Sequence, residues 1–155
     1  QFIQADAASR RGLIQALGKQ NMNTVANVVT RFIQAVNEQD WDRLRCLVMP
    51  SFRRHSRAGG NIHGVDQLIE FLKQEFASFP DAIEICKHQF TDKNMVTAIM
   101  EFSGTQSGAL GEFRPSGLFV SAPYIAVYRV EEDRIAECWA EWDNLSTLKA
   151  LGHIK

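Results

Sequence analysis

The hydrophobic period of this sequence changes near residue 81, from the three- and four-residue spacing of helices to the two-residue spacing of strands. Before that point, apolar residues mark one face of helical stretches that start at Asn23 and Val65. After it, segments rich in β-branched and aromatic residues are separated by turn-like residues such as 91–94. Helices that precede strands indicate an α+β fold, an antiparallel sheet with helices packed on one face.

The first helical stretch runs from Asn23, and its apolar residues repeat at helical spacing through Val36. A second, short helix is predicted over Trp41–Leu47, because Asp40 suits an N-cap and Pro50 follows soon after. We therefore expect two consecutive helices at the start of the domain.

Residues 51–64 are predicted to form a loop, and a third helix is predicted from Val65 through Phe76, before Pro80. The strands and the last helical turn are then expected in the order Ile83–Ile85, Met95–Ser103, Leu118–Val130, Arg134–Asp143 and Asn144–Leu151.

Charge and cysteine content limit the classes of partner and compartment. The 155 residues carry 17 Lys and Arg against 18 Asp and Glu, so no general positive field is available for nucleic acid or an anionic membrane. Three widely spaced cysteines, an odd number, favour a reducing cytoplasmic setting, and no apolar stretch reaches the roughly 18 residues of a membrane span. A chain of this size can still build a pocket without disulfides.

Several kinds of catalytic site lack their sequence signature. No GK[ST] motif follows the glycines, the four histidines have no metal-ligand spacing, and no G-x-S-x-G motif is present. We therefore expect neither a cofactor nor a metal, and the chemistry that remains is acid/base catalysis by single side chains.

Segment 138–143 carries the strongest candidate for that chemistry. Alternation places Trp139 and Asp143 on one face of a strand and Cys138 and Trp142 on the other, so either face holds an indole. A carboxylate among indoles in a cavity poor in water has a raised pKa, which suits a proton shuttle. The alternative is that Asp143 caps the turn that follows, and the spacing alone favours this capping role.

Several short motifs in a fixed order resemble the SnoaL-like polyketide cyclase family, which has the nuclear transport factor two-like fold. They are Phe79-Pro80-Asp81, Phe102-Ser103-Gly104-Thr105 with Gly108, Arg114-Pro115-Ser116-Gly117, Tyr128-Arg129-Val130, Ile135 to Trp139, Asp143 and Leu151-Gly152. The resemblance covers residues 23–152 and implies a single cone-shaped domain, a curved antiparallel sheet wrapped around N-terminal helices with a deep apolar pocket. Residues 1–22 are then an N-terminal extension, either helical or disordered.

The resemblance also implies an activity. Cyclases of this family use a pocket aspartate as general acid/base in an intramolecular aldol condensation without metal or cofactor, and the matching residue here is Asp143. His55 matches a histidine at the mouth of the pocket. The family's strand histidine before the acid is absent from Tyr124–Val130. Cavity-lining candidates are Trp139, Trp142, Tyr124, Tyr128, Phe76, Met100 and Phe102, although aromatic residues at such spacings also fill ordinary cores.

Two functional hypotheses follow. The first is a general acid/base enzyme acting on a hydrophobic, oxygenated small molecule, most sharply a cyclase, with Asp143 and His55 as catalytic residues. In epoxide hydrolase, dehydratase or isomerase variants, Glu141 or Glu137 would pair with Asp143. The second is a non-catalytic small-molecule-binding or dimerisation domain of the same fold. A homodimer is expected in either case.

Overall fold

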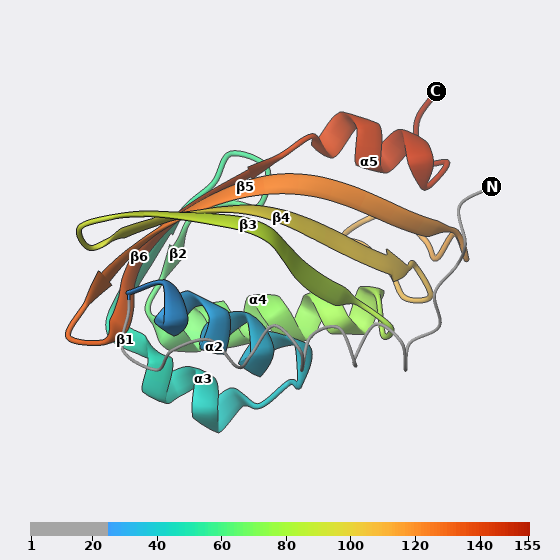
Figure 1. The fold of residues 1–155 in the computed structure, drawn as a ribbon. Helices are drawn as coiled ribbons and strands as arrows, with labels where there is room; N and C mark the ends of the chain where they lie inside the picture. Colours follow the sequence, from blue (N-terminus) through green and yellow to red (C-terminus); the bar gives the residue numbers. More distant parts are fainter. Residues whose placement is uncertain (1–24) are drawn as a thin grey trace.

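A computed structural model of the chain describes residues 25–155. The expected N-terminal extension at residues 1–22 therefore lies outside the described residues. The described part is α+β, as the sequence predicted, and is a curved sheet with helices α2, α3 and α4 on one side (Figure 1). None of the described helices is long and apolar enough to cross a membrane.

The helices follow the predicted apolar spacing. Helix α2 spans Val25–Asn37 and α3 spans Trp41–Leu47, where the Asp40 side chain accepts a hydrogen bond from the Arg43 backbone N–H as an N-cap. Helix α4 spans Val65–Ser78. The short helix α5, Asn144–Ala150, lies at the far end of the strands from α3 (Figure 1).

Six strands form one sheet in the spatial order β2-β1-β6-β5-β4-β3. Their bounds are Val48–His55 for β1, Ile62–His63 for β2, Ile83–Asp92 for β3, Met95–Thr105 for β4, Phe119–Glu131 for β5 and Arg134–Trp142 for β6. Neighbouring strands are antiparallel except β1 and β6, which pair in parallel, so the sheet is mixed.

The prediction of a loop over residues 51–64 is wrong, because this segment contains most of β1 and all of β2. Two features hide β1 in the sequence. The strand contains Pro50, and its pairing with β6 shifts register between Val48 and Arg53. Its inward residues are Phe52 and Arg54, and an arginine on the inner face breaks the apolar alternation that identifies strands.

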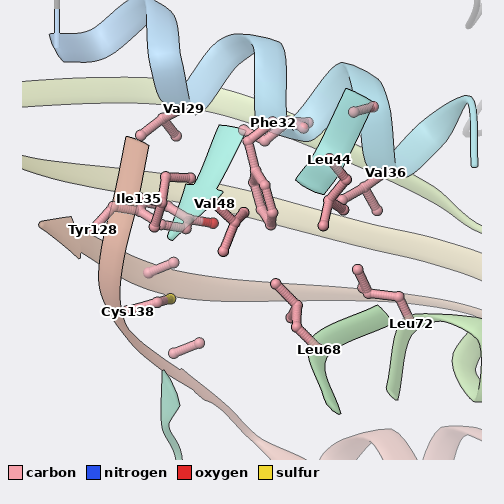
Figure 2. Close-up of a cluster of buried hydrophobic side chains, with 14 of the residues drawn as sticks. Val29, Phe32, Val36, Leu44, Val48, Leu68, Leu72, Tyr128, Ile135 and Cys138 are labelled. Atoms are coloured by element: carbon pink, nitrogen blue, oxygen red, sulfur yellow. The ribbon is translucent and has the colours of Figure 1, made fainter. Parts of the chain in front are cut away.

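The hydrophobic core lies between the helices and the concave face of the sheet, called here the inner face. Figure 2 shows Val29, Phe32 and Val36 of α2 directed toward strand residues such as Tyr128 and Cys138. The ring of Phe32 meets that of Tyr128 edge-on, with centroids 5.9 Å apart. This packing joins α2 to the middle of the sheet.

Candidate active site

A cavity of about 740 Å³ lies between the inner face of the sheet and helices α2 and α4. Part of the inner face here is built from small side chains, and Ala122 of β5 and Ala140 of β6 line the space. Because such side chains do not reach the helices, the sheet and helix layers enclose open volume. A cavity of this size is typical of sites for small molecules.

Glu75 of α4 brings a carboxylate into this apolar space. It follows Leu68, Phe71 and Leu72 on the same helical stripe, and all four line the cavity. Among residues 25–155, no side chain or backbone group donates a hydrogen bond to the Glu75 carboxylate. Burial raises its pKa to about 7, and the positive charge of Arg54 opposes the shift only in part.

Glu84 of β3 supplies a second cavity carboxylate. The Tyr124 hydroxyl donates a hydrogen bond of 2.8 Å to its Oε2 atom. Burial raises the pKa of Glu84 well above its ordinary value, and the negative charge of Glu75 raises it further, so both effects favour the protonated form of Glu84. Asn37 fixes the backbone of Glu84 through two hydrogen bonds of 2.8 Å, one to its carbonyl and one from its N–H.

The two carboxyl groups therefore differ in how readily they hold a proton. Glu75, with a pKa of about 7, is divided between its acid and carboxylate forms near that pH, whereas the charge of ionised Glu75 raises the pKa of Glu84 and favours its acid form. A pair in which one carboxyl group favours its acid form and the other is partly ionised can supply a general acid and a general base in one site. Among the described residues, no three His, Cys, Asp or Glu side chains are grouped so as to hold a metal ion.

Five of the predicted pocket residues line the cavity: Tyr124, Tyr128, Met100, Phe102 and Trp142. Phe76 and Trp139 do not. Phe76 is buried in the core, where its ring meets that of Trp41 at 6.2 Å. Trp139 lies on the opposite, outer face of the sheet, with 37% of its surface exposed.

Asp143 lies outside the cavity, contrary to the prediction that it is held in an apolar pocket. On β6, the side chains of Cys138, Ala140 and Trp142 point to the inner face and line the cavity. Asp143 follows Trp142 directly, so the alternation places it on the outer side at the end of the strand. It is exposed and caps α5, where its carboxylate accepts 3.0 Å and 2.6 Å hydrogen bonds from the backbone N–H and hydroxyl of Ser146. These bonds lower the pKa of Asp143. Asp143 is therefore the N-cap of α5, which is the alternative role considered for it from the sequence.

His55 also lies away from the cavity. Its Nε2 atom is 2.6 Å from a carboxylate oxygen of Glu137, and its ring stacks on Trp139 with centroids 5.3 Å apart. The hydrogen bond with His55, together with two donated by Arg129, lowers the pKa of Glu137. Glu141 is likewise exposed and accepts a hydrogen bond from the Arg57 backbone N–H. The histidine and glutamates proposed from sequence thus belong to the outer face.

Sequence reasoning missed both cavity carboxylates. Glu75 left a signal, because it occupies an apolar position three residues after Leu72 and seven after Leu68, where a solvated glutamate is not expected. Glu84 lies between Ile83 and Ile85 and has the same alternation as an ordinary surface residue of a strand. Its inward direction depends on how β3 packs against α2.

Comparisons with known proteins agree with this architecture. A family model described as SnoaL-like polyketide cyclase matches residues 26–151. Among solved structures, IdmH from Streptomyces antibioticus is 23% identical with a TM-score of 0.75, covering 84% of this chain and 99% of IdmH. TsrD from Streptomyces laurentii is 23% identical with a TM-score of 0.76, covering 86% and 100%.

A SnoaL-like polyketide cyclase from Agrobacterium tumefaciens strain C58 is 21% identical with a TM-score of 0.73, covering 84% of this chain and 100% of that protein. No curated protein sequence matches the chain. At these identities, the structural likeness shows the shared fold.

Proposed function

The chain belongs to the SnoaL-like polyketide cyclase family, and from that premise we propose that it is a cyclase-like enzyme whose general base is Glu75. The observation that carries the proposal is Glu75, with a pKa of about 7, which faces an apolar cavity also lined by Glu84, whose carboxyl group accepts a hydrogen bond from Tyr124 and favours its protonated form. General bases work best when their pKa lies near the working pH.

The proposed reaction is an intramolecular aldol condensation of a polyketide chain folded in the cavity. The Glu75 carboxylate takes a proton from a carbon next to a carbonyl, and the resulting enolate forms a carbon–carbon bond to a second carbonyl carbon. The oxygen of that second carbonyl takes the proton of Glu84, whose carboxyl group is oriented by Tyr124. A proton passed from Glu75 back to Glu84 restores the starting state, so no net proton is consumed. General acid/base steps of this kind contribute about 10²- to 10⁴-fold in rate.

Proton abstraction can be tested without the natural substrate. The methyl protons of 2-acetylnaphthalene exchange in D₂O when a base removes them, and NMR follows the exchange. We expect the protein to accelerate exchange and Glu75→Gln to remove about 10²-fold or more of that acceleration. Glu70→Gln is the matched control, because Glu70 is exposed on the same helix and pairs with Lys73. Exchange that is equally fast in Glu75→Gln contradicts the proposal.

A non-catalytic small-molecule-binding domain is the second candidate. The observation in its favour is that Asp143, which matches the family's catalytic aspartate, caps α5 instead of facing the cavity. The two candidates differ in one measurement, because a binding domain would take up an apolar ligand without accelerating exchange. An isomerase or dehydratase would use the same pair, Glu75 and Glu84, on another substrate.

We also propose that two copies associate through the outer face of the sheet. Ile99 of β4 and Ile125 of β5 are opposite each other on that face and are 37% and 55% exposed, beside the exposed Trp139. Apolar side chains gathered in this way mark interaction surfaces. Analytical ultracentrifugation should give a dimer and Ile125→Lys a monomer, whereas a wild-type monomer of 17.5 kDa at micromolar concentration contradicts the homodimer.

A further inference from the structure

Arg54 of β1 brings a positive charge into the cavity. Among the described residues that line the cavity, it is the only lysine or arginine. Its position on β1 is paired with Cys138 of β6, on the inner face, and only 7% of its surface is exposed. Arginine is rarely buried to this extent without a partner of opposite charge.

The guanidinium is held in place by neutral groups. Its Nη2 atom donates hydrogen bonds of 2.7 Å and 3.2 Å to the carbonyl oxygens of Gly59 and Gly60, and its Cζ atom lies 3.9 Å from the centre of the Phe71 ring. A Cβ atom at Gly59 would lie 2.8 Å from Nη2 and 2.3 Å from the ring of Trp142, so glycine permits this close approach. The side chain is therefore fixed before any ligand arrives.

Part of the hydrogen-bonding capacity of Arg54 is unused. The buried Nε atom has no partner, and Nη1 has none among residues 25–155. No carboxylate of the described residues forms an ion pair with the guanidinium within 4 Å. The titratable groups that influence it are Cys138 and Glu141 of β6, Glu75 of α4 and Tyr124 of β5.

These groups do not neutralise Arg54. Cys138 and Tyr124 are uncharged at neutral pH because burial raises the pKa of both. Glu75 is only partly ionised, and Glu141 is exposed to solvent. An apolar cavity with a fixed, incompletely balanced guanidinium has the electrostatic character of a site for an anion that carries apolar groups.

We propose that Arg54 binds the carboxylate of an apolar carboxylic acid, so that the cavity prefers an acidic substrate to a neutral one of the same shape. This inference rests on the proposed function, because it specifies the substrate class of the same cavity. The guanidinium donates to the carboxylate oxygens, and the carbon skeleton lies along the apolar wall formed by Phe71, Trp142 and their neighbours. The ionised form of Glu75 repels such a ligand, and its protonated form does not.

Isothermal titration calorimetry with 2-naphthoate and with the neutral 2-naphthamide tests the proposal. The two probes share one ring system and differ in charge. We expect the acid to bind about tenfold tighter than the amide, and Arg54→Gln to reduce this preference to near unity. Arg53→Gln is the matched control, because Arg53 is the exposed neighbour on the same strand and its substitution should leave the preference unchanged.

Glu75→Gln provides a second test that leaves the Arg54 site intact. With the competing negative charge removed, the affinity for 2-naphthoate should rise several-fold at a pH near 8 while the affinity for the amide stays the same. If Arg54→Gln does not fold, as judged by circular dichroism, two measurements still test the anion site. They are the effect of Glu75→Gln on 2-naphthoate affinity and the preference of the wild type for 2-naphthoate over 2-naphthamide.

Equal affinities of the wild type for acid and amide would overturn the proposal, as would a preference that survives Arg54→Gln. The outcome is separate from that of the exchange experiment, which reports on Glu75 as a base. A preference for the acid that depends on Arg54, together with exchange that is unaffected by Glu75→Gln, would support the anion site and contradict the proposed reaction.

Discussion

Replacing Glu75 with glutamine should change how the stability of the protein depends on pH. Burial raises the pKa of Glu75 from 4.5 to about 7 in the folded state, and unfolding returns it to its ordinary value. Between these values, the folded chain holds a proton that the unfolded chain has released, so the free energy of unfolding falls as the pH rises. At about 1.36 kcal/mol for each pH unit, the whole effect is about 3 kcal/mol.

Glutamine does not titrate, so the free energy of unfolding of the variant does not fall for this reason as the pH rises. The free energy of unfolding of Glu75→Gln minus that of the wild type should increase by about 2.5 kcal/mol from pH 5 to pH 8, with most of the increase below pH 7. Urea unfolding at several pH values measures it. The difference between the two proteins is the relevant quantity, because groups that Glu75 does not influence titrate alike in both proteins and cancel.

Glu70→Gln serves as the control, since the exposed Glu70 should give a difference independent of pH. A difference for Glu75→Gln that stays within about 0.5 kcal/mol over the whole range would refute the reasoning. Glu75 would then be hydrated in the fold, and a hydrated glutamate would not be poised as a base at neutral pH.

Three further substitutions test the site. Tyr124→Phe removes the donor to Glu84 and should lower the rate of 2-acetylnaphthalene exchange about tenfold or more while circular dichroism stays unchanged. Asn37→Ala leaves two backbone groups of Glu84 without their Asn37 partners. We expect the free energy of unfolding, measured with urea, to fall by about 1–3 kcal/mol, and the exchange of 2-acetylnaphthalene to show a lower kcat at a similar KM. Asp143→Asn should lower the melting temperature by weakening the cap on Ser146 but leave exchange within about twofold, and a larger loss would return Asp143 to the catalytic role.

The helical parts of the fold were predictable from the sequence because their signals are local. The apolar face of Val25–Asn37, the cap at Asp40 and the spacing through Phe76 all act within a few residues of each other. The ordered set of short motifs also indicated the family, and the family model over residues 26–151 confirms it.

The existence of strand β1, and which face of each strand points inward, could be decided only from the tertiary structure. Alternation along β6 separates Trp139 and Asp143 from Trp142, but it assigns neither set to the inside. The packing of α2 and α4 over Cys138 and Ala140 makes that assignment. A shift of one residue in this choice exchanges every side chain between cavity and solvent.

Apart from β1 and β2, the sequence by itself determined the types and order of the elements, and it determined the family, since these depend on periodicity and on motifs read along the chain. Only the tertiary structure decided which charged groups share the cavity. Arg54, Glu75 and Glu84 come from β1, α4 and β3, and their burial, which shifts their pKa values, exists only once the helices lie against the sheet. Desolvation depends on surroundings in space, and a sequence records only neighbours along the chain.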